Sequence, residues 1–154
     1  MIATPEIVQT NAEQAAVIHL TIPRAEMIKT FGTAVDELAA ELTRQGVTPQ
    51  GAVFAHHLIT STVTFDFELG IIVNRPVQVN GPVKPGELPA AKVARTIYGG
   101  PYEGLHLAWI EFNQWMKAND LRQAEDLWEV YSVGPETTPD PVNWRTELHR
   151  PLRD

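Results

Sequence analysis

Hydrophobic and polar residues follow two different periods along this chain. Short runs rich in β-branched and aromatic residues are typical of strands, and they occupy residues 16–22, 51–60, 62–73, 90–100, 126–133 and 144–152. Two longer stretches, 25–45 and 101 to about 118, place apolar residues three and four positions apart, which predicts amphipathic helices. Gly46 suits the C-cap of the first helix, and Pro101 suits the first turn of the second.

Two segments follow neither period. Residues 1–14 are polar, and we expect them to be loose before the first strand. The segment 74–89 contains repeated prolines and glycines, which predicts a linker or a surface loop.

The predicted elements form one unit that occurs twice, at a period of about 75 residues. When the halves are overlaid, residues 54–57 fall opposite residues 128–131, and each half reaches an Arg-Pro pair, Arg75-Pro76 and Arg150-Pro151. We therefore expect a single domain over residues 1–154, with pseudo-repeats at about 15–77 and 90–152 and a linker at 78–89.

The expected fold class is α+β. Duplicated β-α-β-β units would form one mostly antiparallel sheet, with both helices on one face. The opposite face is then left uncovered, and its centre is a natural place for a ligand groove.

Composition excludes several classes of function. The chain has 19 acidic and 12 basic residues, a net charge of −7, and no basic patch, so direct nucleic-acid binding is not expected. No apolar run reaches the length of about 18 residues that a membrane-spanning helix needs, and the N-terminus lacks the order of a signal peptide. Cysteine is absent, which is compatible with the cytoplasmic location that we expect. We expect no cofactor.

Glu129 is the residue that most needs an explanation, because it lies on a strand between aromatic and apolar neighbours. Strand alternation places Glu129 with Tyr131 on one face and Trp128 with Val130 on the other. A buried carboxylate without partners is costly, so we expect Trp128 and Val130 to face the helices. Glu129 and Tyr131 would then face the open groove.

A carboxylate in an aromatic groove would attract cations, and it could also act as a general acid or base. The alternative is an exposed strand glutamate paired with a residue on a neighbouring strand. Further candidates for the groove are aromatic side chains and one histidine, although a tryptophan on a helix stripe is more often a core residue. These candidates are Phe65, Phe67, Tyr98, Tyr102, His57 and Trp109.

A metal site is not expected. His56 and His57 are adjacent on a strand and so point to opposite faces, and no third ligand has a suitable spacing.

Several motifs resemble the GyrI-like (AraC-type effector-binding) small-molecule-binding domain over residues 15–152. The segment FDFELGIIVNRPV in the first half fits as well. The motifs are Gly100-Pro101-Tyr102, Glu129-Val130-Tyr131, the turn 134–139, and Trp144-Arg145-Thr146-Glu147-Leu148 with Pro151.

The resemblance implies a groove between duplicated halves and leaves three functions open. The first is a stand-alone module that binds a hydrophobic, cationic aromatic ligand, with Glu129 as counter-charge and Tyr131 and the other aromatic residues as walls. The second is a hydrolase that opens electrophilic, cyclopropane-type toxins, with Glu129 as general acid or base and Tyr131 as hydrogen-bond donor. The third is a protein-interaction module whose partner is a topoisomerase, as in gyrase inhibitors, or a regulator. The chain leaves no room for a DNA-binding helix-turn-helix, so we do not expect a complete regulator.

Overall fold

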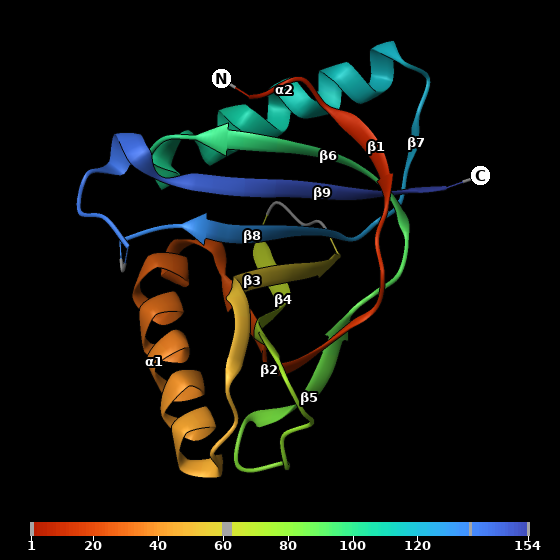
Figure 1. Cartoon of the computed structure of the whole chain (residues 1–154). Coiled ribbons are helices and arrows are strands. Elements are labelled where there is room, and N and C mark those ends of the chain that lie inside the picture. The colour runs from red at the N-terminus through yellow and green to blue at the C-terminus, as the bar shows by residue number, and fades with distance from the viewer. Residues whose placement is uncertain (1, 60–62, 136, 154) are drawn as a thin grey trace. The chain divides into compact units, whose positions relative to one another are not determined.

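Two units make up the fold, and each packs one long helix against antiparallel strands (Figure 1). The computed structural model describes residues 2–59, 63–135 and 137–153, apart from the side chains of residues 28 and 59. The continuous unit comprises Asn11–Ala90, and the discontinuous unit comprises Met1–Thr10 with Ala91–Asp154. Among the described residues, no helix combines the length and the apolar character needed to cross a membrane.

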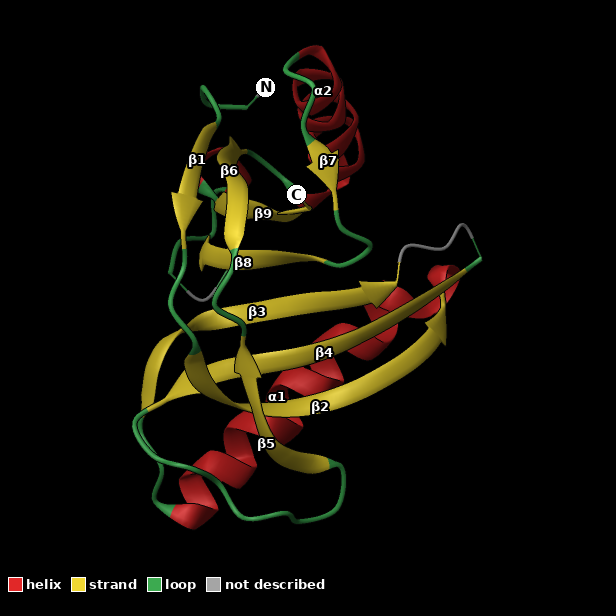
Figure 2. Cartoon of the chain, turned by 90° about the vertical axis from the view of Figure 1, so that its right-hand side faces the viewer, coloured by secondary structure: helices red, strands yellow, loops and turns green. Residues whose placement is uncertain are grey.

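The continuous unit has four strands in the order β3-β4-β2-β5. Its helix packs against β2 and β4, and Figure 2 shows it crossing behind these strands. The core between helix and sheet includes Ala16, Ile18, Leu38 and Leu42. The elements are β2 (Glu13–Pro23), a 3-10 turn (Arg24–Glu26), α1 (Met27–Gln45), β3 (Pro49–Ile59), β4 (Thr64–Val73) and β5 (Val83–Leu88).

The discontinuous unit has the order β1-β6-β9-β8, and the short strand β7 pairs with the end of β9. Its helix α2 lies along β6, over a core of Ala94, Phe112, Met116 and Leu148. The elements are β1 (Glu6–Gln9), β6 (Lys92–Gly99), a 3-10 turn (Tyr102–Gly104), α2 (Leu105–Ala118), β7 (Arg122–Gln123), β8 (Leu127–Val133), a second turn (Pro141–Asn143) and β9 (Arg145–Arg153).

The structure confirms the α+β class with duplicated β-α-β-β units, and the strand register agrees with the overlay of the two halves. Ala55 pairs with Leu69 on β3 and β4, and Glu129 pairs with Leu148 on β8 and β9. Because cross-strand partners share a face, Ala55 and Glu129 hold equivalent positions. The predicted strand ends at residues 60 and 62 lie outside the described residues.

Two edge strands lie where the sequence predicts none. Strand β1 lies in the segment expected to be loose and pairs with β6, and β5 lies in the expected linker 78–89 and pairs with β2. Strand β1 precedes β2 in the chain but pairs with β6 of the discontinuous unit. Strand β5 precedes β6 in the chain but pairs with β2 of the continuous unit. Polar residues and Pro85 signalled loops, but an edge strand tolerates both because only one side of its backbone is paired.

The two Arg-Pro pairs serve equivalent purposes after the two helices. Gly46 ends α1 with a φ of 67°, and the Arg75 guanidinium donates to the carbonyls of Gln45 and Gly46 at 2.9 Å. Arg150 donates to the carbonyl of Ala124 beyond α2, at 2.8 and 3.0 Å. Each arginine therefore satisfies carbonyl groups that the helix end or the following loop leaves without partners.

The orientation predicted for β8 is wrong. Glu129 pairs with Leu148, a core residue beneath α2, so Glu129 and Tyr131 face the helix. Trp128 lies on the opposite face, where it is 2% exposed and stacks on His149 with ring centroids 5.4 Å apart. The prediction failed because it assumed that a carboxylate beneath an aromatic helix would lack hydrogen-bond partners.

His149 is a buried histidine in a charged surrounding. The Arg95 guanidinium forms ion pairs of 3.2 Å with both Glu6 and Glu147, and the Glu147 carboxylate lies 3.7 Å from His149 Nε2. Burial, and then the positive charge of Arg95, lowers the pKa of His149 from 6.5 to about 4.

A substitution at Gly70 should destabilise the continuous unit. A Cβ there would lie 2.4 Å from Phe54 Cζ and 2.9 Å from Val17 Cγ1, and both side chains are fully buried. We expect Gly70→Ala to lower the free energy of unfolding by about 1–3 kcal/mol.

The matched control is Gly32→Ala on α1, where no atom lies within 4 Å of the added Cβ. This variant should gain up to about 1 kcal/mol. Equal stabilities of the two variants in urea titrations would contradict the packing argument.

The stability of the chain should depend on His149 below neutral pH. Because the folded-state pKa is depressed from 6.5 to about 4, the unfolded chain binds more protons between these values, so stability is full above pH 6.5 and falls as the pH drops towards 4. Complete loss amounts to about 3 kcal/mol. Urea titrations of the wild type and of His149→Phe, which keeps a ring beside Trp128, measure the effect. The stability difference between the two proteins should shrink or reverse on acidification, and a constant difference would refute the assignment.

Candidate ligand-binding site

The Glu129 carboxylate lies beneath α2 and accepts hydrogen bonds from two aromatic side chains. It is 8% exposed. Trp109 Nε1 on α2 donates to Oε2 at 2.6 Å, and the Tyr131 hydroxyl donates to Oε1 at 2.7 Å. Tyr131 reaches it because residues two apart on a strand share a face. Each carboxylate oxygen therefore has its own donor, which offsets much of the cost of burial.

The Glu129 charge has no cationic partner in the part of the chain that the structure describes. Among the described residues, no lysine, arginine or histidine forms an ion pair with Glu129. Burial, followed by the negative charge of Glu129 and the hydrogen bond to it, raises the pKa of Tyr131 well above its usual value. The phenol therefore stays protonated and acts as a donor, and the site presents a negative charge surrounded by neutral aromatic groups.

Further aromatic rings extend the site from Tyr131. Tyr102 meets Tyr131 edge-on with ring centroids 5.7 Å apart, and Trp144 stacks against Tyr102 at 4.8 Å and a tilt of 32°. The structure thus brings together Glu129, Tyr131, Tyr102 and Trp109. Trp144 is not among the site residues predicted from the sequence, although it belongs to the motif that begins at this residue.

Tyr98 supports the turn next to the site. The side chain is buried in the core beneath α2, and its hydroxyl donates to the carbonyl of Pro101 at 2.8 Å. It also fills the space beside Gly104, where a Cβ would lie 2.0 Å from the Tyr98 hydroxyl. Tyr98 therefore fixes the turn that presents Tyr102, and its role as a groove wall stays a prediction.

Phe65, Phe67 and His57 form a cluster of their own in the continuous unit. His57 stacks on Phe67 at 5.1 Å and meets the edge of Phe65 at 5.3 Å. The Arg24 guanidinium lies 4.2 Å from the centre of the Phe65 ring. The structure gathers these predicted residues, and their role as ligand walls stays a prediction.

The described residues hold no group of three or more histidine, aspartate and glutamate side chains arranged as metal ligands. His56 pairs with Glu68, whereas His57 pairs with Phe67, so the two histidines lie on opposite faces of β3.

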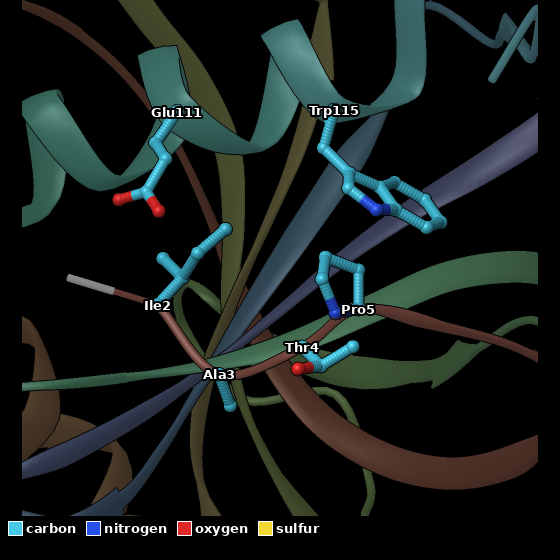
Figure 3. A pocket seen from close by; sticks show the side chains of 6 residues that line it. All are labelled: Ile2, Ala3, Thr4, Pro5, Glu111 and Trp115. Carbon is cyan, nitrogen blue, oxygen red and sulfur yellow. The ribbon is translucent and has the colours of Figure 1, made fainter. Parts of the chain in front are cut away.

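An open hollow lies elsewhere on the discontinuous unit, between α2 and the N-terminal segment (Figure 3). Glu111 and Trp115 extend from α2 towards Ile2, Thr4 and Pro5. Glu111 is exposed, in contrast to Glu129. The hollow therefore offers a carboxylate of the same charge in an environment open to water, which makes Glu111 a useful control for Glu129.

Solved structures with similar folds were found, whereas no curated protein sequence matched the chain. The C-terminal domain of EcmrR has a TM-score of 0.86 and 20% identity, with 98% of both chains covered. EcmrR was also solved in a complex with DNA. The present chain spans 57% of that EcmrR chain, with a TM-score of 0.87 and 19% identity.

Two further structures are less similar. SAV2435 bound to tetraphenylphosphonium has a TM-score of 0.73 and 10% identity, with coverage of 98% of this chain and 94% of that one. A hydrolase from Listeria innocua has a TM-score of 0.66 and 14% identity, with coverage of 97% and 91%. At these identities the likeness shows the fold alone.

The sequence itself identifies the family. The family model for the GyrI-like small molecule binding domain matches residues 3–153, which includes both units and every residue around Glu129. The match confirms the resemblance drawn from the motifs. The chain therefore belongs to the GyrI-like small molecule binding domain family.

Proposed function

We propose that this domain binds a hydrophobic cation with aromatic groups, and that Glu129 provides the counter-charge. The observation that supports this most directly is the buried Glu129 carboxylate, whose two hydrogen bonds come from neutral donors and which forms no ion pair among the described residues. A buried charge without a counter-ion favours an opposite charge that can enter from outside.

The rings around Glu129 favour a cation that is itself apolar. Aromatic faces attract cations by roughly 0.5–2 kcal/mol each, and the value is larger where water is excluded. Tyr131, Tyr102 and Trp109 lie around or next to the carboxylate. A hydrophobic cation would bring apolar area to these rings and lose little hydration of its own on binding.

The related structures agree with this proposal without establishing it. SAV2435, which has a similar fold, was solved with tetraphenylphosphonium, a lipophilic aromatic cation. EcmrR contains a domain of this fold within a longer chain and was solved on DNA. By analogy, we propose that any regulatory role of this chain acts through a protein partner, because its net charge of −7 does not favour direct contact with nucleic acid.

Replacing Glu129 by glutamine should abolish most cation binding. The substitution removes the charge while keeping the size and one acceptor oxygen, and loss of a desolvated charge pair typically costs 2–5 kcal/mol, or about thirtyfold or more in affinity. Calorimetric titration of tetraphenylphosphonium and of a rhodamine dye into both proteins measures the change.

The matched control is Glu111→Gln, which changes the net charge equally at an exposed position on α2. This variant should bind both cations as the wild type does. If Glu129→Gln binds as tightly as the wild type, the proposal is wrong. If only Glu111→Gln loses affinity, the cation binds in the hollow beside the N-terminal segment instead.

A hydrolase is the second candidate, and the Tyr131–Glu129 hydrogen bond of 2.7 Å is the observation that favours it. A carboxylate paired with a phenol can shift protons during the opening of a strained or activated substrate. Against this function, both oxygens of Glu129 already accept hydrogen bonds, which stabilise the carboxylate form over the protonated form that a general acid needs.

We expect no Glu129-dependent turnover of a cyclopropane-bearing electrophile. Chromatography of the ring-opened product, at several pH values, compares the wild type with Glu129→Gln and Tyr131→Phe. All three proteins should give the same background rate. A faster wild-type rate that both substitutions abolish would establish the hydrolase and displace the simple binding function.

A further inference from the structure

Trp144 is fixed at the edge of the Glu129 site by its backbone. Its carbonyl accepts hydrogen bonds from the Gly100 amide at 3.0 Å and from Arg145 Nη1 at 2.7 Å. Its own amide donates to the carbonyl of Pro141 at 3.1 Å. Since Gly100 directly precedes Pro101 and Tyr102, these bonds fasten the start of β9 to the turn that presents Tyr102.

The side chain of Trp144 is fixed as well. Its Nε1 donates to the carbonyl of Thr138 at 3.0 Å, which holds the indole within the loop between β8 and β9. The indole then stacks against Tyr102 at 4.8 Å, and Tyr102 meets Tyr131 at 5.7 Å. A continuous series of contacts therefore leads from Thr138 through Trp144, Tyr102 and Tyr131 to the Glu129 carboxylate.

Of the two rings that contact Tyr102, the indole of Trp144 lies nearer, at 4.8 Å against 5.7 Å for Tyr131. The hydroxyl of Tyr98 supports the backbone of the turn at Pro101, but it does not determine how the Tyr102 side chain is rotated. A tyrosine at the first turn of a helix has several rotamers, and a ring held in one of them loses less entropy when a ligand stacks on it.

We propose that Trp144 is a positioning residue, which holds the Tyr102 ring for ligand aromatic groups and thereby selects aromatic over aliphatic cations. The selectivity rests on the proposed function of Glu129, whereas the positioning of Tyr102 does not. The charge of the ligand is recognised by Glu129, and its rings are recognised by the Tyr102 ring that Trp144 orients. The affinity for an aliphatic cation of the same charge should therefore not change when Trp144 is replaced.

The positioning can be tested without any ligand. The chain has three tyrosines, so fluorotyrosine labelling gives a simple ¹⁹F NMR spectrum that Tyr→Phe variants assign. Trp144→Leu keeps apolar bulk but removes the indole, so the Tyr102 signal should move and broaden while that of Tyr98 stays. Trp144→Phe should restore much of the wild-type spectrum. An unchanged Tyr102 signal in Trp144→Leu would overturn the positioning role.

The selectivity can be tested with tetraphenylphosphonium and tetrabutylphosphonium. The two ions have the same charge, but only the first has aromatic rings. Trp144→Leu should weaken binding of the aromatic cation about two- to tenfold, the equivalent of one aromatic contact, and leave the aliphatic cation unchanged. Trp115→Leu, on the far end of α2, is the control. If Trp144→Leu weakens both cations equally, or neither, the selectivity is refuted.

Glu129→Gln, measured in the same series, separates this proposal from the proposed function. Binding that survives in Glu129→Gln rejects Glu129 as the counter-charge, whatever Trp144 does. Binding that is lost in Glu129→Gln, with an unchanged preference between the two cations in Trp144→Leu, rejects only the selectivity role of Trp144. If neither cation binds the wild type, the ¹⁹F spectra alone decide whether Trp144 positions Tyr102.

Discussion

The hydrogen bonds from Trp109 and Tyr131 to Glu129 connect a helix, a strand and a buried charge in one interaction. A carboxylate at this depth would destabilise the discontinuous unit if either oxygen lacked a donor. The Trp109 indole on α2 provides one of the donors, so the contact that joins α2 to β8 also satisfies Glu129. The same hydrogen bond therefore affects both the stability of the discontinuous unit and the charge of the site. A change that displaces Trp109 would leave one oxygen of Glu129 without this donor.

The duplication explains how such a residue could be accommodated. Glu129 and Ala55 hold equivalent positions beneath the helices of the two units, and Ala55 is fully buried. An alanine requires nothing of its helix, whereas the glutamate requires a donor at a particular point on α2. The two units therefore share a backbone plan, and at these equivalent positions one unit has a carboxylate and the other a methyl group.

Much of the fold could be predicted from the sequence, because periodicity and turn residues are local signals. The helices end at Gln45 and Ala118 as predicted, and the overlay of the halves gave the correct equivalence of Glu129 with Ala55. The edge strands β1 and β5 were not predictable in this way, since they are polar and are held by long-range backbone pairing. The direction of Glu129 failed for a related reason. Burial of a charge depends on partners distant in sequence, and helical periodicity does not show that Trp109 meets Glu129.

The hydrogen bonding of Glu129 also bears on which cations suit the proposed site. An ammonium ligand gains much of its affinity by donating N–H groups to a carboxylate, but here each oxygen already accepts from an aromatic donor. Such a ligand would have to compete with Trp109 and Tyr131 or use the remaining lone pairs. A phosphonium or quaternary ammonium ion needs no acceptor and gains only from charge and ring contact, which the site offers undiminished. Cations with a permanent charge and no hydrogen-bond donor are therefore the chemical class whose binding is least weakened by the existing hydrogen bonds to Glu129.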